Sequence, residues 1–145
     1  MKRFAFRLEK VLELRKYKES EVEMRLAGAT SLCVRLEQEI LDLQVKKNET
    51  LQVLTQSLEP GWILSCEAYT RRLVATAEKR QVELASAQIQ REKIQAEFIL
   101  AQRDRKILDK LKEKKHAAYK KEQIQNEFKI QDDRNTGAYI KKQEA

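Results

Sequence analysis

The sequence has few of the residues that interrupt regular structure. Its 145 residues include three glycines and one proline, and aromatic residues make up only 6% of the chain. Charged residues make up 37%, and Gln, Glu, Lys, Arg, Leu and Ala dominate. This composition is typical of a coiled coil or a long helix and argues against a compact globule. Intrinsic disorder is the competing interpretation of such polarity, but it predicts no apolar period.

Residues that carry most enzyme chemistry are also scarce. His116 is the only histidine, which excludes a histidine cluster for metal binding or proton relay. It stands among lysines, and we interpret it as an exposed helix residue. The sequence contains no glycine-rich phosphate loop and no nucleophile beside a base, so we predict a non-enzyme without cofactor or metal. It also contains no apolar run near ~18 residues, which predicts no transmembrane helix.

The two cysteines, Cys33 and Cys66, give only weak information about the cellular compartment. If the chain reverses near Pro60, antiparallel register places Cys33 opposite about Gln90 or Arg91. The two thiols then cannot meet without refolding of the chain. We therefore interpret both as reduced, half-buried side chains of a cytoplasmic protein.

The only proline and one of the three glycines lie together in Glu59-Pro60-Gly61-Trp62. Proline biases the preceding residue away from the helical conformation, and glycine tolerates backbone angles that are closed to other residues. Together they predict a reversal between two long helices, with Ser65 as the N-cap of the second. The expected segments are a helix over about 3–58, a turn over 59–64, a helix over about 65–135 and a frayed tail over 136–145.

The first expected helix carries apolar residues at alternating steps of four and three, which is the left-handed coiled-coil period. These residues are Val22, Leu26, Ala29, Cys33, Leu36, Ile40 and Leu43. A continuation to Leu51, Leu54 and Leu58 must pass through Lys47 in two steps of four, a stutter that locally unwinds the supercoil. Nearer the N-terminus, one helical face is expected to contain Phe4, Leu8, Val11, Leu12 and Arg15.

The second expected helix continues the same period. Its seam is Tyr69, Leu73, Ala77, Arg80, Leu84, Ala87, Arg91, Ile94, Phe98, Ala101, Arg105 and Leu108. A flanking apolar edge is added by Val82, Ile89, Leu100, Ile107 and Leu111. The seam residues Arg80, Arg91 and Arg105 are expected to extend toward acidic partners and to set register more than stability. The two patterns predict an all-α fold, an antiparallel two-helix coiled-coil hairpin.

The net charge of +7 is concentrated in one stretch, residues 103–121, which contains nine basic residues and three acidic ones. By the antiparallel count this stretch lies near the N-terminus, at the end of the hairpin away from the turn. One interpretation is a solvated flank of the coiled coil. The other is an electrostatic docking end for an acidic partner surface. Neither a recognised nucleic-acid motif nor interleaved aromatic residues accompany the charge.

The segment Phe4–Arg15, with the sequence FAFRLEKVLELR, resembles the opening of the FliJ family of flagellar type III export proteins. The chain length, the Pro-Gly turn and the basic Leu108–Lys115 stretch with its polar tail also fit, so the resemblance covers essentially the whole chain. It implies a cytoplasmic hairpin similar to the stalk (gamma) subunit of rotary ATPases. It also implies a part in flagellum biogenesis and motility, peripheral to the inner membrane at the flagellar base.

The resemblance further implies the partners and their surfaces. The partners are the flagellar export ATPase hexamer, the cytoplasmic domain of the export-gate membrane protein and export chaperones. The ATPase end is expected to use Phe4, Phe6, Arg7, Leu8, Lys110, Lys112, Lys114 and Lys115. The export-gate surface is expected to use Leu43, Tyr69 and Leu73. The neighbouring Lys46 and Thr50 depart from the family pattern, in which aromatic residues occur at these positions.

Two other classes of function stay open from the residues alone. The first is a structural or scaffold coiled coil that associates with itself through the seam. The Pro-Gly break favours a monomeric hairpin over a filament, because a filament favours unbroken heptads. The second is a basic, nucleic-acid-associated helical protein, which predicts a steep salt dependence of binding to DNA or RNA.

Overall fold

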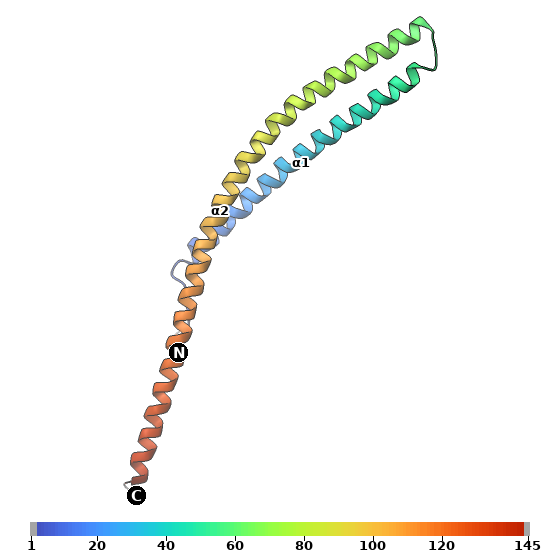
Figure 1. Ribbon diagram of the computed structural model, residues 1–145. Coiled ribbons are helices and arrows are strands. Elements are labelled where there is room, and N and C mark those ends of the chain that lie inside the picture. The colour runs from blue at the N-terminus through green and yellow to red at the C-terminus, as the bar shows by residue number, and fades with distance from the viewer. Residues whose placement is uncertain (1–2, 144–145) are drawn as a thin grey trace. The chain divides into compact units, whose positions relative to one another are not determined.

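The computed structural model describes residues 3–143, and two long helices dominate it (Figure 1). Helix α1 spans Glu9–Leu54, helix α2 spans Pro60–Gln143, and no strand occurs within the described residues. The helices run in opposite directions and pack against each other. The prediction of an all-α, antiparallel two-helix hairpin is therefore confirmed.

The contacts divide the chain into two units, each of which contains a stretch of both helices. One unit is Glu19–Ala101, which includes the turn between the helices. The other combines the chain up to Lys18 with the chain from Gln102 onward. In the Glu19–Ala101 unit, the most tightly packed cluster joins Cys33, Leu36 and Ala87 with the half-buried Leu84.

The predicted seam of α1 is confirmed from Val22 to Leu43, because all seven of its residues are buried or half-buried. The predicted stutter is wrong. Beyond Leu43 the half-buried positions of α1 are Lys47, Thr50, Val53 and Leu54, whereas Leu51 and Leu58 are 45% and 91% exposed. The regular 4-3-4 spacing, and not side-chain polarity, decides which residues face the other helix here. Lys47 can occupy such a position because a lysine can bury its aliphatic stem and keep its ammonium group in water.

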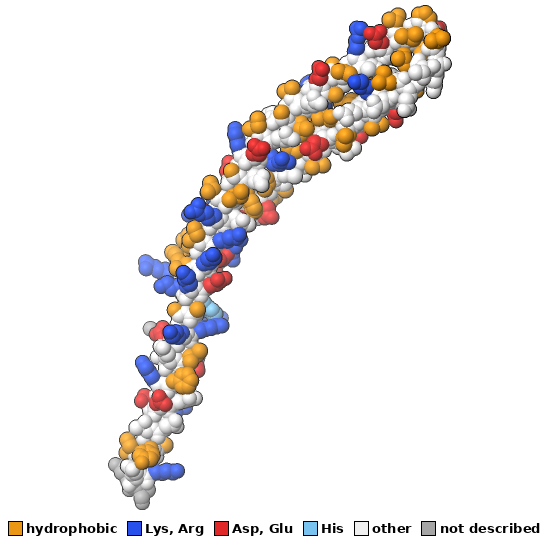
Figure 2. All heavy atoms as spheres, viewed as in Figure 1, with side chains coloured by type: hydrophobic (Ala, Val, Ile, Leu, Met, Phe, Trp, Pro, Cys, Tyr) orange, Lys and Arg blue, Asp and Glu red, His pale blue; other side chains and the backbone are white. Residues whose placement is uncertain are grey.

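The predicted seam of α2 is confirmed from Leu73 to Leu108, because each residue that was predicted for the seam in this range is buried or half-buried. It fails at Tyr69, which is 44% exposed, and the inward positions there are Cys66 and Thr70. Four residues of the predicted flanking edge are also exposed, namely Val82, Ile89, Leu100 and Ile107. A hairpin of two helices covers only one narrow face of each, so hydrophobic side chains also lie on the outer surface (Figure 2).

The reversal lies before Pro60, not around it, because α1 ends at Leu54 and α2 begins at Pro60. Proline suits the first position of a helix, where its fixed backbone angle is already helical and its missing N–H needs no partner. The backbone N–H of Ile63 donates to the carbonyl of Glu59 at 3.1 Å, which closes the first turn. Ser65 is therefore no N-cap, and its hydroxyl donates to the carbonyl of Gly61 at 3.0 Å inside the helix.

Both outer boundaries of the predicted helices also differ from the structure. Residues 3–8 are not helical, and α1 begins at Glu9, an acid in the first turn where the helix dipole favours one. Helix α2 continues through Gly137 to Gln143, so the predicted frayed tail is helical over 136–143. Its last two residues lie outside the described part of the chain. A single glycine costs a helix about 1 kcal/mol relative to alanine, which weakens the helix without ending it.

Both cysteines are buried free thiols. Cys33 packs with Leu36 and Ala87 rather than opposite Gln90 or Arg91. The pairing register is thus displaced by about one helical turn from the register expected for a tip at Pro60. The displacement follows from the earlier end of α1.

Ion pairs join the two helices on the edges of the seam. In the Glu19–Ala101 unit, Arg25 pairs with Glu97 at 2.9 Å, and Arg80 Nε pairs with Glu39 Oε2 at 3.0 Å. Arg80 Nη1 also donates to Glu83 Oε2 at 2.6 Å, as expected for a seam arginine that extends toward acids. This hydrogen bond, together with the charges of Glu83 and Glu39, raises the pKa of Arg80 above its ordinary value.

The other unit has the same arrangement. Arg15 pairs with Asp104 at 2.9 Å, and Lys112 Nζ pairs with Glu9 Oε1 at 2.8 Å. Exposed pairs of this kind contribute only about 0.2–1 kcal/mol each. They select the antiparallel register more than they stabilise the hairpin.

Replacing Gly28 with alanine is expected to stabilise the Glu19–Ala101 unit. Gly28 lies inside α1 with a negative φ, and a Cβ added there meets no atom within 4 Å. The substitution should raise the free energy of unfolding by about 0.5–1 kcal/mol, because alanine loses less backbone entropy in a helix. Urea denaturation followed by circular dichroism measures this change.

The matched control is Gly137→Ala, the same replacement in equally open space near the end of α2. Helix ends fray, so this variant should shift the main unfolding transition much less. A destabilised Gly28→Ala protein would contradict the open surroundings of Gly28.

Candidate functional site

The chain before α1, residues 3–8, is not helical and ends in a turn at Arg7 and Leu8; we call it the N-terminal strap. Phe4, Phe6 and Leu8 are half-buried, whereas Ala5 and Arg7 between them are exposed. This alternation is the two-residue period of an extended chain. The sequence shows this alternation as Phe-Ala-Phe-Arg-Leu. We instead expected a helical face with apolar residues at three- and four-residue spacing. That expectation is wrong for Phe4 and also for Val11, which is exposed.

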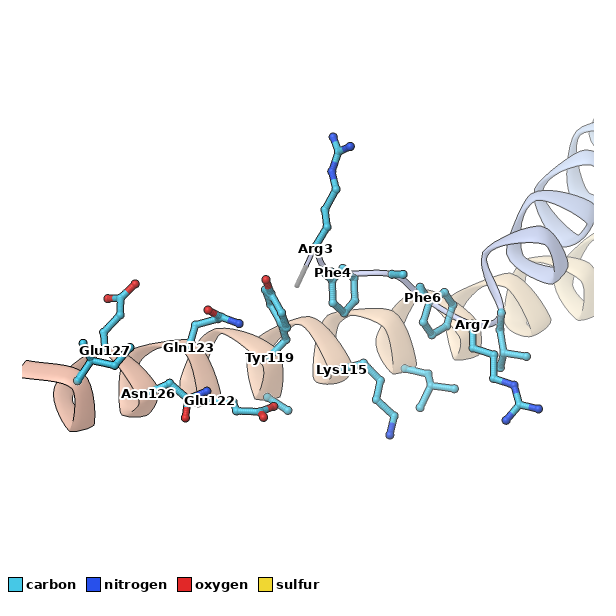
Figure 3. Close-up of a pocket in the computed structure, with 15 residues that line it drawn as sticks. Arg3, Phe4, Phe6, Arg7, Lys115, Tyr119, Glu122, Gln123, Asn126 and Glu127 are labelled. Carbon is cyan, nitrogen blue, oxygen red and sulfur yellow. The ribbon is translucent and has the colours of Figure 1, made fainter. Parts of the chain in front are cut away.

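The strap is held on α2 by aromatic contacts (Figure 3). The ring of Phe4 meets the ring of His116 edge to face, with centroids 4.9 Å apart and an interplanar angle of 75°. It also meets Tyr119, with centroids 5.5 Å apart. His116 is exposed, as predicted, but its ring also serves as a packing surface for the strap. An extended strap directs both phenylalanines toward α2, which a helical turn of the same residues cannot do.

The strap and α2 together form a groove of about 1160 Å³. Figure 3 shows Phe4 beside Tyr119, and Gln123 and Asn126 farther along α2, past the end of the strap. The apolar part of the lining comes from Phe4, Phe6, Leu8, Leu111 and Ile130. The groove is open along α2, so its shape suits a protein segment better than an enclosed small molecule.

The structure brings together most of the residues expected at the ATPase end. Phe4, Phe6, Arg7, Leu8 and Lys115 all line the strap groove. Lys112 has a different position, because its ammonium group pairs with Glu9 and holds the first turn of α1 on α2. Lys110 and Lys114 are exposed and do not line the groove. The predicted set therefore separates into a groove group, one structural lysine and two outward lysines.

The residues expected at the export gate do not form one surface. Leu43 and Leu73 belong to the seam, and Leu73 is only 7% exposed. Tyr69 instead lines a separate groove with Lys46, Thr50 and Trp62, all in the Glu19–Ala101 unit. The expectation missed Trp62, although the sequence marks it as the single tryptophan beside the turn.

The described chain contains neither a metal-ligand cluster nor a helix able to span a membrane. Within residues 3–143, no three His, Cys, Asp or Glu side chains gather as metal ligands would. Neither helix, in that range, is long and apolar enough to cross a bilayer. Its most distinctive features are the strap groove and the Tyr69 groove. These features define the class of the protein, a helical hairpin with open grooves on its surface.

The comparison with protein families identifies the chain more closely. A family model described as the flagellar FliJ protein matches residues 4–144, and the chain belongs to that family. The match confirms the resemblance that begins at the strap and gives the chain a flagellar, export-related role. Comparisons with curated proteins and with solved structures found no match.

Replacing Phe4 with alanine is expected to loosen the strap without unfolding the helices. The change removes the ring contacts with His116 and Tyr119, which contribute about 0.5–1.5 kcal/mol for each aromatic pair. Amide hydrogen exchange of the strap and tryptic cleavage after Arg7 should therefore accelerate by about fivefold or more. Helicity by circular dichroism should stay nearly constant.

Ala5→Ser is the matched control, because Ala5 is an exposed residue of the same strap. This variant should exchange at the parent rate. Equal exchange in the Phe4→Ala protein would show that the aromatic contacts do not hold the strap.

Proposed function

We propose that this protein is a non-enzymatic component of the flagellar type III export apparatus that docks in the central hole of the export ATPase ring. There it promotes ring assembly and activity and links the ring to the export gate. One observation carries the proposal. The segment on which the family resemblance begins, Phe4–Arg15, is the segment that forms the strap and the start of α1.

The chemistry of the strap region supports docking to an acidic protein surface. Arg7 and Lys115 place cationic groups beside the half-buried Phe6 and Leu8 in one groove. Charge of one sign accelerates encounter with an oppositely charged surface, and the apolar side chains supply short-range contact. The outward lysines Lys110 and Lys114 extend the same positive field. The action proposed is mechanical and allosteric, since the hairpin conveys the state of one partner to another.

Reversing three lysines should slow association with the export ATPase. The variant is Lys110→Glu, Lys114→Glu and Lys115→Glu; Lys112 is left intact because its pair with Glu9 holds α1. We expect a lower on-rate, about tenfold at low salt, and a flatter dependence on salt. Stimulation of the purified ATPase should fall in parallel. Surface-binding rates at two salt concentrations and an ATPase assay measure these changes.

The matched control makes the same charge change in the other unit, with Arg72→Glu, Lys79→Glu and Lys93→Glu, all at exposed positions. It should bind more nearly at the parent rate. Equal on-rates for the parent and the three-lysine variant would support the solvated-flank interpretation of the basic stretch.

The link to the export gate is the second part of the proposal, and Tyr69 is its contact residue. Tyr69 and Trp62 are the exposed aromatic residues of a groove that also contains Lys46 and Thr50. Exposed tyrosine and tryptophan are the residue types that most often dominate protein interfaces. Leu43 and Leu73 act beneath this surface, by holding the seam of the hairpin. We include the handling of export chaperones in the proposed function because the chain belongs to the FliJ family.

Tyr69→Ala should weaken binding to the purified cytoplasmic domain of the export gate by about tenfold or more. Tyr17→Ala is the control, because Tyr17 is an exposed tyrosine of α1 outside that groove. Binding to the ATPase should be unaffected by either change. Unchanged gate affinity in a helical Tyr69→Ala protein would place the gate contact elsewhere.

A further inference from the structure

The outer surface of α2 carries a second heptad-like stripe that the hairpin does not use. It begins at Arg103 and ends at Phe128, with alternating steps of four and three residues if the small Ala117 is counted between Lys114 and Lys121. Its basic members are Arg103, Lys110, Lys114 and Lys121, and its large apolar members are Ile107, Ile124 and Phe128. We call these seven residues the basic-apolar stripe. All of them are exposed, and all lie in the unit that contains the N-terminal strap.

The stripe lies away from the seam. Arg105, Leu108 and Lys112, which face α1, fall between its members and are half-buried. None of its basic side chains forms an ion pair within residues 3–143, whereas the neighbouring acids Asp104 and Asp109 pair with Arg15 and Arg105. The stripe itself contains no acidic residue. It is therefore a row of four positive charges, which the exposed acids Glu113 and Glu122 adjoin without pairing to them within residues 3–143.

The apolar members of the stripe are more than half exposed, like other apolar residues on the outer surface of the hairpin. Ile107, Ile124 and Phe128 are 56%, 53% and 62% exposed. In a solvated flank these positions favour polar residues. Basic and hydrophobic side chains are interleaved over this part of α2 in Figure 2. Lysine and arginine on such a face can lay their aliphatic stems along the apolar side chains and keep their charged groups in water, as they do at membrane interfaces.

We propose that the basic-apolar stripe binds directly to the surface of a membrane that contains anionic phospholipids. The lysine ammonium groups lie at the level of the lipid phosphates, and their aliphatic stems follow the apolar side chains inward. Ile107, Ile124 and Phe128 insert at the boundary between headgroups and acyl chains. We propose an anionic membrane as the partner because its negative charge complements the basic residues of the stripe, which contains no acidic residue.

The stripe fits nucleic acid less well than lipid. Single-stranded nucleic acid binding uses aromatic side chains on which successive bases stack, and the stripe has only Phe128. Three of its four basic residues are lysines, which lack the bidentate geometry that arginine uses toward bases and phosphates. The two isoleucines of the stripe have no role in base stacking or in hydrogen bonding to bases and phosphates.

This inference goes beyond the proposed function and has its own test. The stripe shares Lys110 and Lys114 with the surface proposed for the ATPase, so lipid binding is measured without the ATPase. Flotation of the full-length protein with phosphatidylcholine vesicles, with or without about one-third phosphatidylglycerol, gives the partition coefficient. We expect binding only to the anionic vesicles, and weaker binding as salt is raised.

Two variants separate the charge from the apolar contribution. The variant Lys110→Gln, Lys114→Gln and Lys121→Gln should lower partitioning on the order of 100-fold at low salt. The variant Ile107→Ser, Ile124→Ser and Phe128→Ser keeps the charge and should lower it by about tenfold or more. The matched control, Arg72→Gln, Lys79→Gln and Lys93→Gln, should partition nearly as the parent does. Loss in the control equal to that in the lysine variant would overturn the assignment to the stripe.

A fluorescence reporter tests insertion independently of any loss of folding. The protein with Trp62→Phe and Phe128→Trp has its single tryptophan in the stripe. Its emission should shift to the blue with phosphatidylglycerol vesicles and stay constant with phosphatidylcholine vesicles or with duplex DNA. An unshifted emission on bound vesicles would overturn insertion of the stripe. Tighter binding to DNA than to the vesicles at equal salt would assign the stripe to nucleic acid instead.

Discussion

The narrow seam between α1 and α2 is the interaction on which the rest of the structure depends. Its buried residues are few, and several are small, among them Cys33, Ala87 and Ala101. Small residues allow the helices to approach closely, while larger ones such as Leu12 and Leu36 fill the spaces between them. Because such a seam alone discriminates poorly between registers, the ion pairs along its edges, such as Arg80 with Glu39, supply the missing specificity.

The strap covers the part of α2 that lies beyond the first residue of α1. Helix α1 begins only at Glu9, yet α2 continues with Leu111 and Tyr119 on the same face. The non-helical residues 3–8 cover this face with about half the number of residues per contact that a helix would need, since alternate side chains point toward α2. Past the strap nothing covers α2 in the described chain, and its side chains there are exposed. The strap groove thus lies where the pairing of the two helices stops.

The sequence predicted well those features that depend on repeated spacing. The seam from Val22 to Leu43 and from Leu73 to Leu108 follows from a period that many residues report together. Features that depend on one residue were predicted poorly. Pro60 can end one helix or begin the next, and only the packing of α1 decides between them. Thr50 is half-buried while Leu51 is exposed, because the spacing of the whole seam outweighs the hydrophobicity of one position.

The candidate surfaces were also predicted poorly wherever they depend on a short segment or on a single residue. The strap residues Phe4, Phe6 and Leu8 were expected at a docking end, but their extended conformation was not, since six residues are too few to distinguish the two periods. Leu73 was expected on a partner surface and is buried, because an apolar residue at a seam position serves the seam first.

The small number of buried side chains has a consequence for how such sequences diverge. The fold asks for an apolar or small residue only every three or four positions, and most of the remaining positions face water. Surface substitutions of this kind change stability little. Two members can therefore lose most pairwise identity while both retain the hairpin, and a description of the whole family detects a kinship that comparison of individual chains does not.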